Sequence, residues 1–245
     1  MDLSDHGLPE IRDLADEFAR EHGWDEIEAL GESDRDYKAF KAEAWARKAV
    51  AEGDLPERLG FLQALSGDEN WQVREAVAMA LKYVNEHAFA QVEPAWKEWV
   101  VHENNYVRRA CEVGLMRTPP EHVGPVLDLF DHLVADSDDY VKKSCGAFAL
   151  SNVAATDPAV SREYMERWSR ADDLRTRWNV AKAIGGGYGR ATDHAVELAY
   201  RLSGDEAYRV RRATASSLKK RFDDDPDWRE QVEGWDDRDE FRSLL

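Results

Sequence analysis

Four stretches of the chain share a seven-residue pattern in which a polar residue precedes a valine by five positions and a basic residue follows. They read DENWQVR at residues 68–74, HENNYVR at residues 102–108, DSDDYVK at residues 136–142 and DEAYRVR at residues 205–211. The valines at 73, 107 and 141 are 34 residues apart, and a degenerate copy places Thr176 in the valine position 34 residues before Val210. A fixed period of this length is typical of proteins built from stacked structural repeats.

Each copy of the pattern begins a stretch with one apolar side. Eight residues after each valine position an apolar residue recurs, at Leu81, Leu115, Ala149, Ile184 and Leu218. This spacing predicts an amphipathic helix, which the acidic residues before it would cap. A second apolar series, at 88–101, 122–134, 159–169 and 193–202, predicts a partner helix for each.

The fold class expected from these patterns is all-α, a HEAT-like-repeat α-solenoid in which antiparallel helix pairs form a right-handed superhelix. We expect a single domain over residues 1–245. Residues 1–60 would form N-terminal capping helices, residues 61–221 the repeats of about 34 residues, and residues 222–245 an acidic cap or tail.

Charge is unevenly distributed along the 245 residues, whose formal net charge is -17. Residues 1–36 carry 13 acidic and 3 basic side chains, residues 222–245 carry 10 and 3, and the middle of the chain is neutral. Acidic ends argue against non-specific nucleic-acid binding by the whole chain but leave room for a local basic row. No apolar run is long enough for a membrane span, and no signal peptide is evident, so we expect a cytoplasmic protein and no membrane partner.

Several kinds of chemical site find no support in the sequence. Cys111 and Cys145 occupy the same repeat position, and we expect both to be reduced, buried core residues. The seven histidines show no metal-ligand spacing, so no metal is expected. The glycine-rich residues 185–189 are better explained as the end of a helix than as a phosphate-binding loop. Trp96, Trp99 and Trp168 fall on apolar faces and are expected in the core.

A row of basic side chains recurs once per helix pair, directly after each valine position. Its members are Arg74, Arg108, Arg109, Lys142, Lys143, Arg177, Arg211 and Arg212. One interpretation is a phosphate-binding stripe, with Trp71 and Trp178 beside it to stack on bases or sugars. The alternative is structural: the first base of each pair would join the acidic residue of a neighbouring repeat in a ladder, and the tryptophans would pack at the rim.

The blocks around these residues resemble the HEAT-like-repeat DNA alkylation repair family, which includes bacterial alkylpurine DNA glycosylases. The resemblance covers roughly residues 60–190 and rests on residues 70–75, 103–109, 139–144, 166–168 and 175–178. It implies a solenoid that grips duplex DNA and cleaves the N-glycosidic bond of cationic alkylpurines. Carboxylates and aromatic side chains would stabilise the positive sugar, and no cofactor would be needed.

The candidate catalytic residues under this resemblance are Glu75 and Glu112. Where the family has a glutamate before a glycine, this chain has Val113, and Glu112 lies one residue earlier, turned by about 100° on a helix. Three functions therefore stay open: a glycosylase-like repair protein with weakened catalysis, a non-enzymatic scaffold that binds a protein partner in its concave groove, and a protein that binds unusual DNA without cleaving it.

Overall fold

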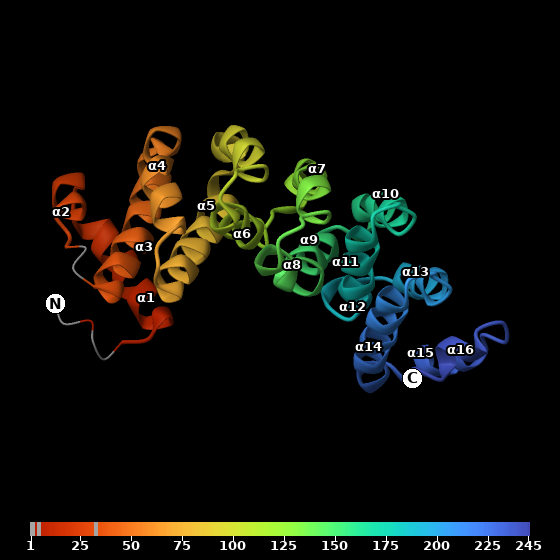
Figure 1. The fold of residues 1–245 in the computed structure, drawn as a ribbon. Helices are drawn as coiled ribbons and strands as arrows, with labels where there is room; N and C mark the ends of the chain where they lie inside the picture. Colours follow the sequence, from red (N-terminus) through yellow and green to blue (C-terminus); the bar gives the residue numbers. More distant parts are fainter. Residues whose placement is uncertain (1–2, 4–5, 32–33) are drawn as a thin grey trace. The chain divides into compact units, whose positions relative to one another are not determined.

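A computed structural model describes residue 3, residues 6–31 and residues 34–245. All regular secondary structure in this described part is helical, which confirms the expected all-α class (Figure 1). The chain divides into two compact units, Met1–Arg117 and Thr118–Leu245. None of the described helices is both long enough and apolar enough to cross a bilayer.

The first unit contains six helices among its described residues. They are α1 (Leu8–Glu21), α2 (Trp24–Glu28), α3 (Arg35–Glu52), α4 (Leu55–Ser66), α5 (Trp71–Trp99) and α6 (Asn105–Gly114). Helix α5 joins two expected helices into one, with a kink where Ala88 leaves the helical region at φ -149° and ψ 32°. The expected polar turn at this place is therefore reduced to one irregular residue.

The second unit is also helical throughout the part that the structure describes. Its elements are η1 (Pro120–His122), α7 (Val123–Leu133), α8 (Asp139–Ser144), η2 (Cys145–Leu150), α9 (Ser151–Thr156), α10 (Pro158–Trp168), α11 (Leu174–Ile184), α12 (Gly187–Ala191), α13 (His194–Ser203), α14 (Tyr208–Asp224), α15 (Pro226–Glu233) and α16 (Asp239–Arg242). Element η2 is a π-helical turn between α8 and α9, so the three together form one interrupted helix. The C-terminal segment, expected to form an acidic cap or tail, contains two short helices, α15 and α16.

The repeat positions form the core, as the sequence predicts. Val73, Val107, Val141, Thr176 and Val210 are all buried, and so are the five residues that follow them by eight positions. Trp96, Trp99 and Trp168 are buried as well. The 34-residue period thus marks the apolar face along which neighbouring helices pack.

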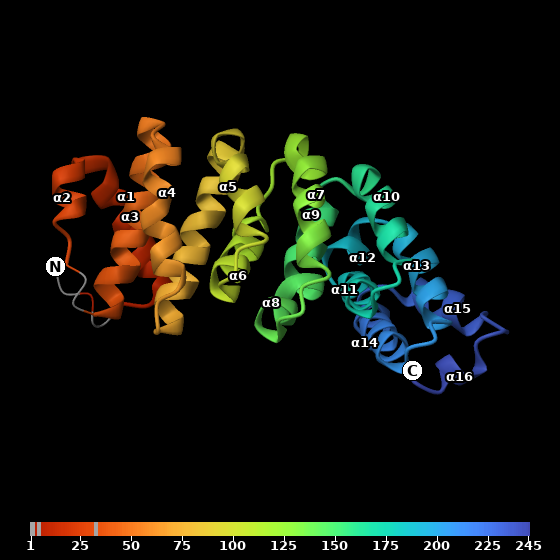
Figure 2. The ribbon, with the colours of Figure 1, turned by 45° about the horizontal axis from the view of Figure 1, so that its top comes forward.

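Within each unit the helices pack as stacked antiparallel pairs (Figure 2). In the first unit α3 packs against α1, α4 and α5, and α5 packs in turn against α6. In the second unit one layer contains α7, α10 and α13, and the other contains η2, α11 and α14. This arrangement is the HEAT-like repeat architecture expected from the sequence.

Side-chain caps explain where α5, α6, α8 and α11 begin, whereas α14 begins after Ala207 without one. The side chains of Asn70, Asn104 and Asp138 each accept a hydrogen bond from the backbone amide two residues ahead, at 2.8–2.9 Å. The Asp173 carboxylate accepts one from the Thr176 amide at 2.7 Å. Such caps satisfy amides that have no partner inside the helix. The expected capping by acidic residues is confirmed at Asp138 and Asp173.

The glycine-rich segment serves close packing in the second unit. Helix α11 ends at Ile184 as predicted, but a short helix, α12, starts only three residues later. A Cβ atom at Gly186 would lie 2.3 Å from Ser151 Oγ, and one at Gly189 would lie 1.9 Å from the Ile184 carbonyl oxygen. Larger residues at these two positions would therefore force the helices apart.

Candidate nucleic-acid interface

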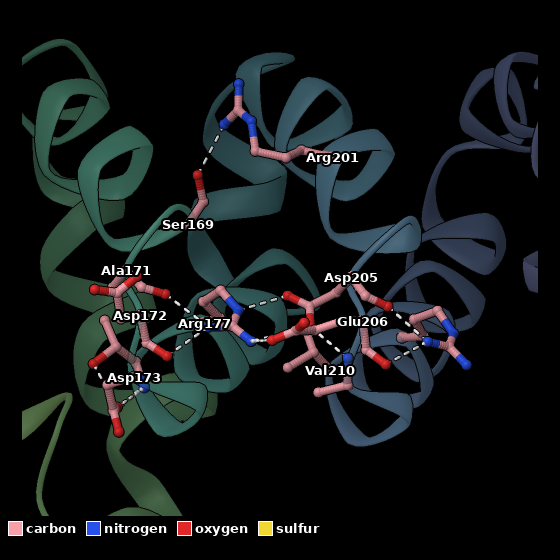
Figure 3. A network of polar contacts seen from close by, with 12 residues as sticks. Ser169, Ala171, Asp172, Asp173, Arg177, Arg201, Asp205, Glu206 and Val210 are labelled. Atoms are coloured by element: carbon pink, nitrogen blue, oxygen red, sulfur yellow. Dashed lines mark hydrogen bonds and ion pairs between the residues drawn. The ribbon is translucent and has the colours of Figure 1, made fainter.

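The first base of most pairs in the basic row is bound to the loop that precedes its own helix. Arg74, Arg108, Arg177 and Arg211 each donate from Nη1 to the backbone carbonyl oxygens six and five residues earlier, at 2.6–3.1 Å. Figure 3 shows this contact for Arg177, whose guanidinium reaches the carbonyls of Ala171 and Asp172. We call these four side chains the clip arginines, because each holds its loop closed.

The acidic residue that begins each signature completes the same turn. The side chains of Asp68, Asp136 and Asp205 each accept a hydrogen bond at 2.8 Å from the backbone amide two residues ahead. His102 Nδ1 takes the same role, 3.0 Å from the Asn104 amide. The signature therefore encodes a loop whose amides and carbonyls are both satisfied by side chains.

Arg177 also forms the expected ladder with the next repeat. Its Nε lies 2.6 Å and its Nη2 3.2 Å from the two carboxylate oxygens of Asp205 (Figure 3). The hydrogen bonds that the Arg177 guanidinium donates to Asp205 raise its pKa above the ordinary value. Lys38 and Asp68 form the corresponding pair in the first unit, at 2.6 Å. At Arg177, therefore, the first base of the row joins the acidic residue of the neighbouring repeat, as the structural interpretation predicts.

The second bases of the pairs have a different environment. Lys143 and Arg212 are exposed, whereas Arg109 is half-buried and its Nε lies 3.9 Å from Glu112. Lys142 is a first base that does not clip its loop: its Nζ lies 3.8 Å from Asp139 and 4.9 Å from the centre of the Trp178 ring. Lys143 and Arg212 are therefore the exposed bases of the row, whereas the Arg109 side chain is only 17% exposed.

An aromatic and an acidic side chain share one face of α5. Trp71, in the first turn of the helix, is 61% exposed, and Glu75 is half-buried one turn further on. Residues four apart on an α-helix lie above one another. Arg109 lies on α6, which packs against α5. The charges of both Glu75 and Arg109 act on Lys82, the next polar residue along α5, so Arg109 lies near the same face. We call Trp71, Glu75 and Arg109 together the α5 face.

Glu112 and Val113 lie in the interior of the first unit. Glu112 has no exposed surface and Val113 is buried beside it. Neither side chain can touch a bound molecule in this conformation. Of the two candidate catalytic carboxylates, only Glu75 is accessible from outside.

The two thiols are buried, as the sequence predicts, and are not joined in a disulfide. Burial, together with the nearby Glu112 carboxylate, raises the pKa of the Cys111 thiol well above its ordinary value. Because the thiolate is the reactive form, we expect native-state labelling by a disulfide reagent to be about 100-fold or more slower than in urea. Raising the pH to 9 should not remove this difference in labelling rate. Rapid labelling of both cysteines in the native protein would contradict the buried assignment.

A second aromatic site lies in the other unit, around the half-buried Trp178. Lys142 and Lys182 both place an ammonium near its ring, at 4.9 and 5.8 Å from the centre. Burial and then the charge of Lys220 lower the pKa of Lys182. Trp178 is thus surrounded by cations, an arrangement that favours an anionic or phosphate-bearing ligand.

Sequence reasoning missed three side chains in these regions. Lys82 and Lys182 are half-buried lysines outside the repeating basic row, and Phe148 is 58% exposed on the π-helical turn. Helical spacing could have found Lys82, because it follows Glu75 by seven residues and so shares its face. The apolar pattern does not predict the π-helical turn on which Phe148 is exposed.

One group of possible metal ligands occurs among the described residues, at Glu166, His194 and Glu197. Glu166 accepts from His194 Nε2 at 2.7 Å and pairs with Arg170 and Arg201 at 2.7 and 2.9 Å. Two arginines beside the same carboxylate repel a metal cation. The cluster is better understood as a polar network that joins α10 to α13.

Comparison with known proteins gives the family. No curated protein matches the chain. Among solved structures, an engineered protein of the Northeast Structural Genomics Consortium is 15% identical, with a TM-score of 0.37 over 86% of this chain and 96% of that one. A designed armadillo repeat protein is 14% identical, with a TM-score of 0.36 over 79% of this chain and 97% of that one. The family model described as DNA alkylation repair enzyme matches residues 7–185. This protein therefore belongs to the DNA alkylation repair enzyme family.

Proposed function

We propose that the protein binds duplex DNA and excises alkylated purines slowly, through the α5 face. The observation that supports this most directly is the α5 face itself, where an exposed indole, an accessible carboxylate and a guanidinium lie within the region matched by the family model. An indole can stack on a base or cover a deoxyribose, and a guanidinium can bind a phosphate.

The chemistry assigned to Glu75 is electrostatic. An alkylated purine is cationic and leaves readily, so the sugar that remains develops positive charge at C1′. A fixed carboxylate nearby stabilises that charge without a cofactor. Glu112, buried behind Arg109, would act at most by positioning that side chain.

Excision should be weak in the wild-type protein. The family position before Gly114 holds Val113, which is buried and carries no charge. Loss of one preorganised charged group typically costs about 100- to 1000-fold in rate. The test is release of a methylated purine from duplex DNA under single-turnover conditions, compared with spontaneous release in buffer.

DNA affinity should depend on the second bases of the row rather than on the clip arginines. We expect Arg109→Ala, Lys143→Ala and Arg212→Ala each to lower the slope of log K against log salt by about 0.9 per lost phosphate contact. The matched controls are Arg108→Ala and Arg211→Ala, which change the neighbouring base of the same pair and should leave the slope unchanged.

An unchanged slope in all three second-base variants would mean that the row is structural. That result would favour the alternative function, a non-enzymatic scaffold for a protein partner. Trp178 and Lys142 belong to the DNA proposal as a separate contact in the second unit, where Arg177 contributes through the fold. The reduced state of both buried cysteines suits action in the cytoplasm.

A further inference from the structure

Lys82 stands out among the lysines near the α5 face. Trp71, Glu75, Met79 and Lys82 follow one another at spacings of four, four and three residues along α5. These spacings place all four side chains along one stripe of the helix. Lys82 therefore extends the face that carries the accessible carboxylate.

The contacts of Lys82 differ from those of the three lysines that form close ion pairs. Lys38, Lys48 and Lys97 each place Nζ within 3 Å of a carboxylate oxygen. Lys82 Nζ instead lies 3.8 Å from the Met79 sulfur, and no described carboxylate approaches it within ion-pair distance. A half-buried amine without a bound carboxylate is available to react.

We propose that Lys82 forms an imine with the aldehyde of an abasic deoxyribose, so that the protein also cleaves the DNA strand at abasic sites. This inference rests on the proposed function, because excision of a purine leaves that sugar beside the α5 face. It adds a second reaction, β-elimination, and names its substrate class as the ring-opened sugar in duplex DNA.

The electrostatic environment of Lys82 supports this role. Burial lowers the pKa of its amine, and the guanidiniums of Arg117 and Arg109 lower it further. Glu75 acts in the opposite direction. The charge of Arg12 also lowers the pKa of Lys82. The neutral amine is the nucleophile, so a lowered pKa increases the reactive fraction near neutral pH.

Each step of the reaction can be assigned. The neutral Nζ of Lys82 adds to C1′ of the open-chain sugar, and the carbinolamine loses water to give a protonated imine. Glu75 then takes a proton from C2′, a C2′–C3′ double bond forms, and the C3′–O bond breaks as the phosphate leaves with the electron pair. Water hydrolyses the imine and restores Lys82. No oxidant, reductant or metal is required.

Lys182 is the natural comparison, because burial lowers its pKa too. Its environment is set by Lys220 and Trp178, and no carboxylate contributes to it. A base for the C2′ proton is therefore missing there. The matched control for Lys82→Arg is instead Lys97→Arg, which changes an exposed lysine of the same helix that is paired with Glu93 at 2.7 Å.

The experiment uses the full chain and a duplex that already contains one abasic site, so that purine excision is not needed. Sodium borohydride reduces an imine to a stable amine and traps the protein on the DNA. We expect a trapped adduct with the wild type and with Lys97→Arg, and its loss in Lys82→Arg. Anisotropy measurements on the same duplex report binding separately, and mass spectrometry of the wild-type adduct should place the new bond on Lys82.

The outcomes separate this inference from the proposed function. Wild-type protein that binds the abasic duplex but gives no adduct overturns the role of Lys82 and leaves DNA binding intact. An adduct retained by Lys82→Arg, or mapped to another residue, has the same consequence. Failure to bind the duplex at all overturns both. The mapping on wild-type protein decides the matter even if the Lys82 variant does not fold.

Discussion

Replacing Glu75 with glutamine should lower the release of a methylated purine from duplex DNA by about 100- to 1000-fold, to near the spontaneous rate. The substitution keeps the size of the side chain and removes its negative charge. Glu75 is the accessible one of the two candidate carboxylates, and it lies one helical turn from the exposed Trp71. A developing positive charge at C1′ would lose its electrostatic partner. The measurement is single-turnover release with protein in excess over DNA.

Two further variants make this prediction specific. Glu98→Gln changes an exposed carboxylate further along the same helix and should leave release unchanged. Glu112→Gln removes a carboxylate that is fully buried, and should lower release far less than Glu75→Gln. Robust release that survives in Glu75→Gln would place the active site elsewhere. Release abolished by Glu112→Gln alone would show that a local rearrangement brings the buried carboxylate to the sugar.

The fold could be predicted because its repeat depends on packing. Each helix pair buries the same positions, so apolar residues must recur every 34 residues at Val73, Val107 and Val141. Where the prediction failed, local packing decided the backbone. No glycine or proline lies between Lys82 and Glu93, so the chain continues through a kink at Ala88 rather than a turn.

The π-helical turn η2 is another place where packing, and not the apolar pattern, decides the backbone. Gly146 lies so close to α11 that a Cβ atom there would be 2.4 Å from the Asn179 carbonyl oxygen. The Asn179 side chain accepts from the Gly146 amide at 3.1 Å and donates to the Val134 carbonyl at 2.8 Å. These contacts join residues far apart in the sequence, and no helical period encodes them.

The candidate site was predictable in position but not in the role of each base. The spacing places a basic residue after every valine, yet spacing alone does not say which of two adjacent bases turns back to the loop. Arg108 and Arg109 illustrate this: the first donates to the carbonyls of His102 and Glu103, and the second lies beside Glu112 on the next part of the helix. Only the contacts separate a structural base from one that can reach a ligand.

Replacing Arg177 with alanine should lower the free energy of unfolding by about 3–5 kcal/mol, because it breaks a buried ion pair from one side. The Arg177 and Asp205 side chains are only 11% and 6% exposed. The variant would leave the Asp205 carboxylate without its arginine and the carbonyls of Ala171 and Asp172 without their donor. Urea denaturation followed by circular dichroism measures the loss.

Two comparisons identify the source of that loss. Arg177→Lys keeps the charge but cannot reproduce the paired hydrogen bonds of a guanidinium. Its free energy of unfolding should therefore lie between those of Arg177→Ala and the wild type. Arg212→Ala removes an exposed base and should change stability by no more than about 0.5 kcal/mol. A loss below about 1 kcal/mol in Arg177→Ala would show that the clip and ladder contribute little to the fold. Arg177 would then be as free as Arg212 to act on DNA, and the division of the basic row into structural and binding members would fail.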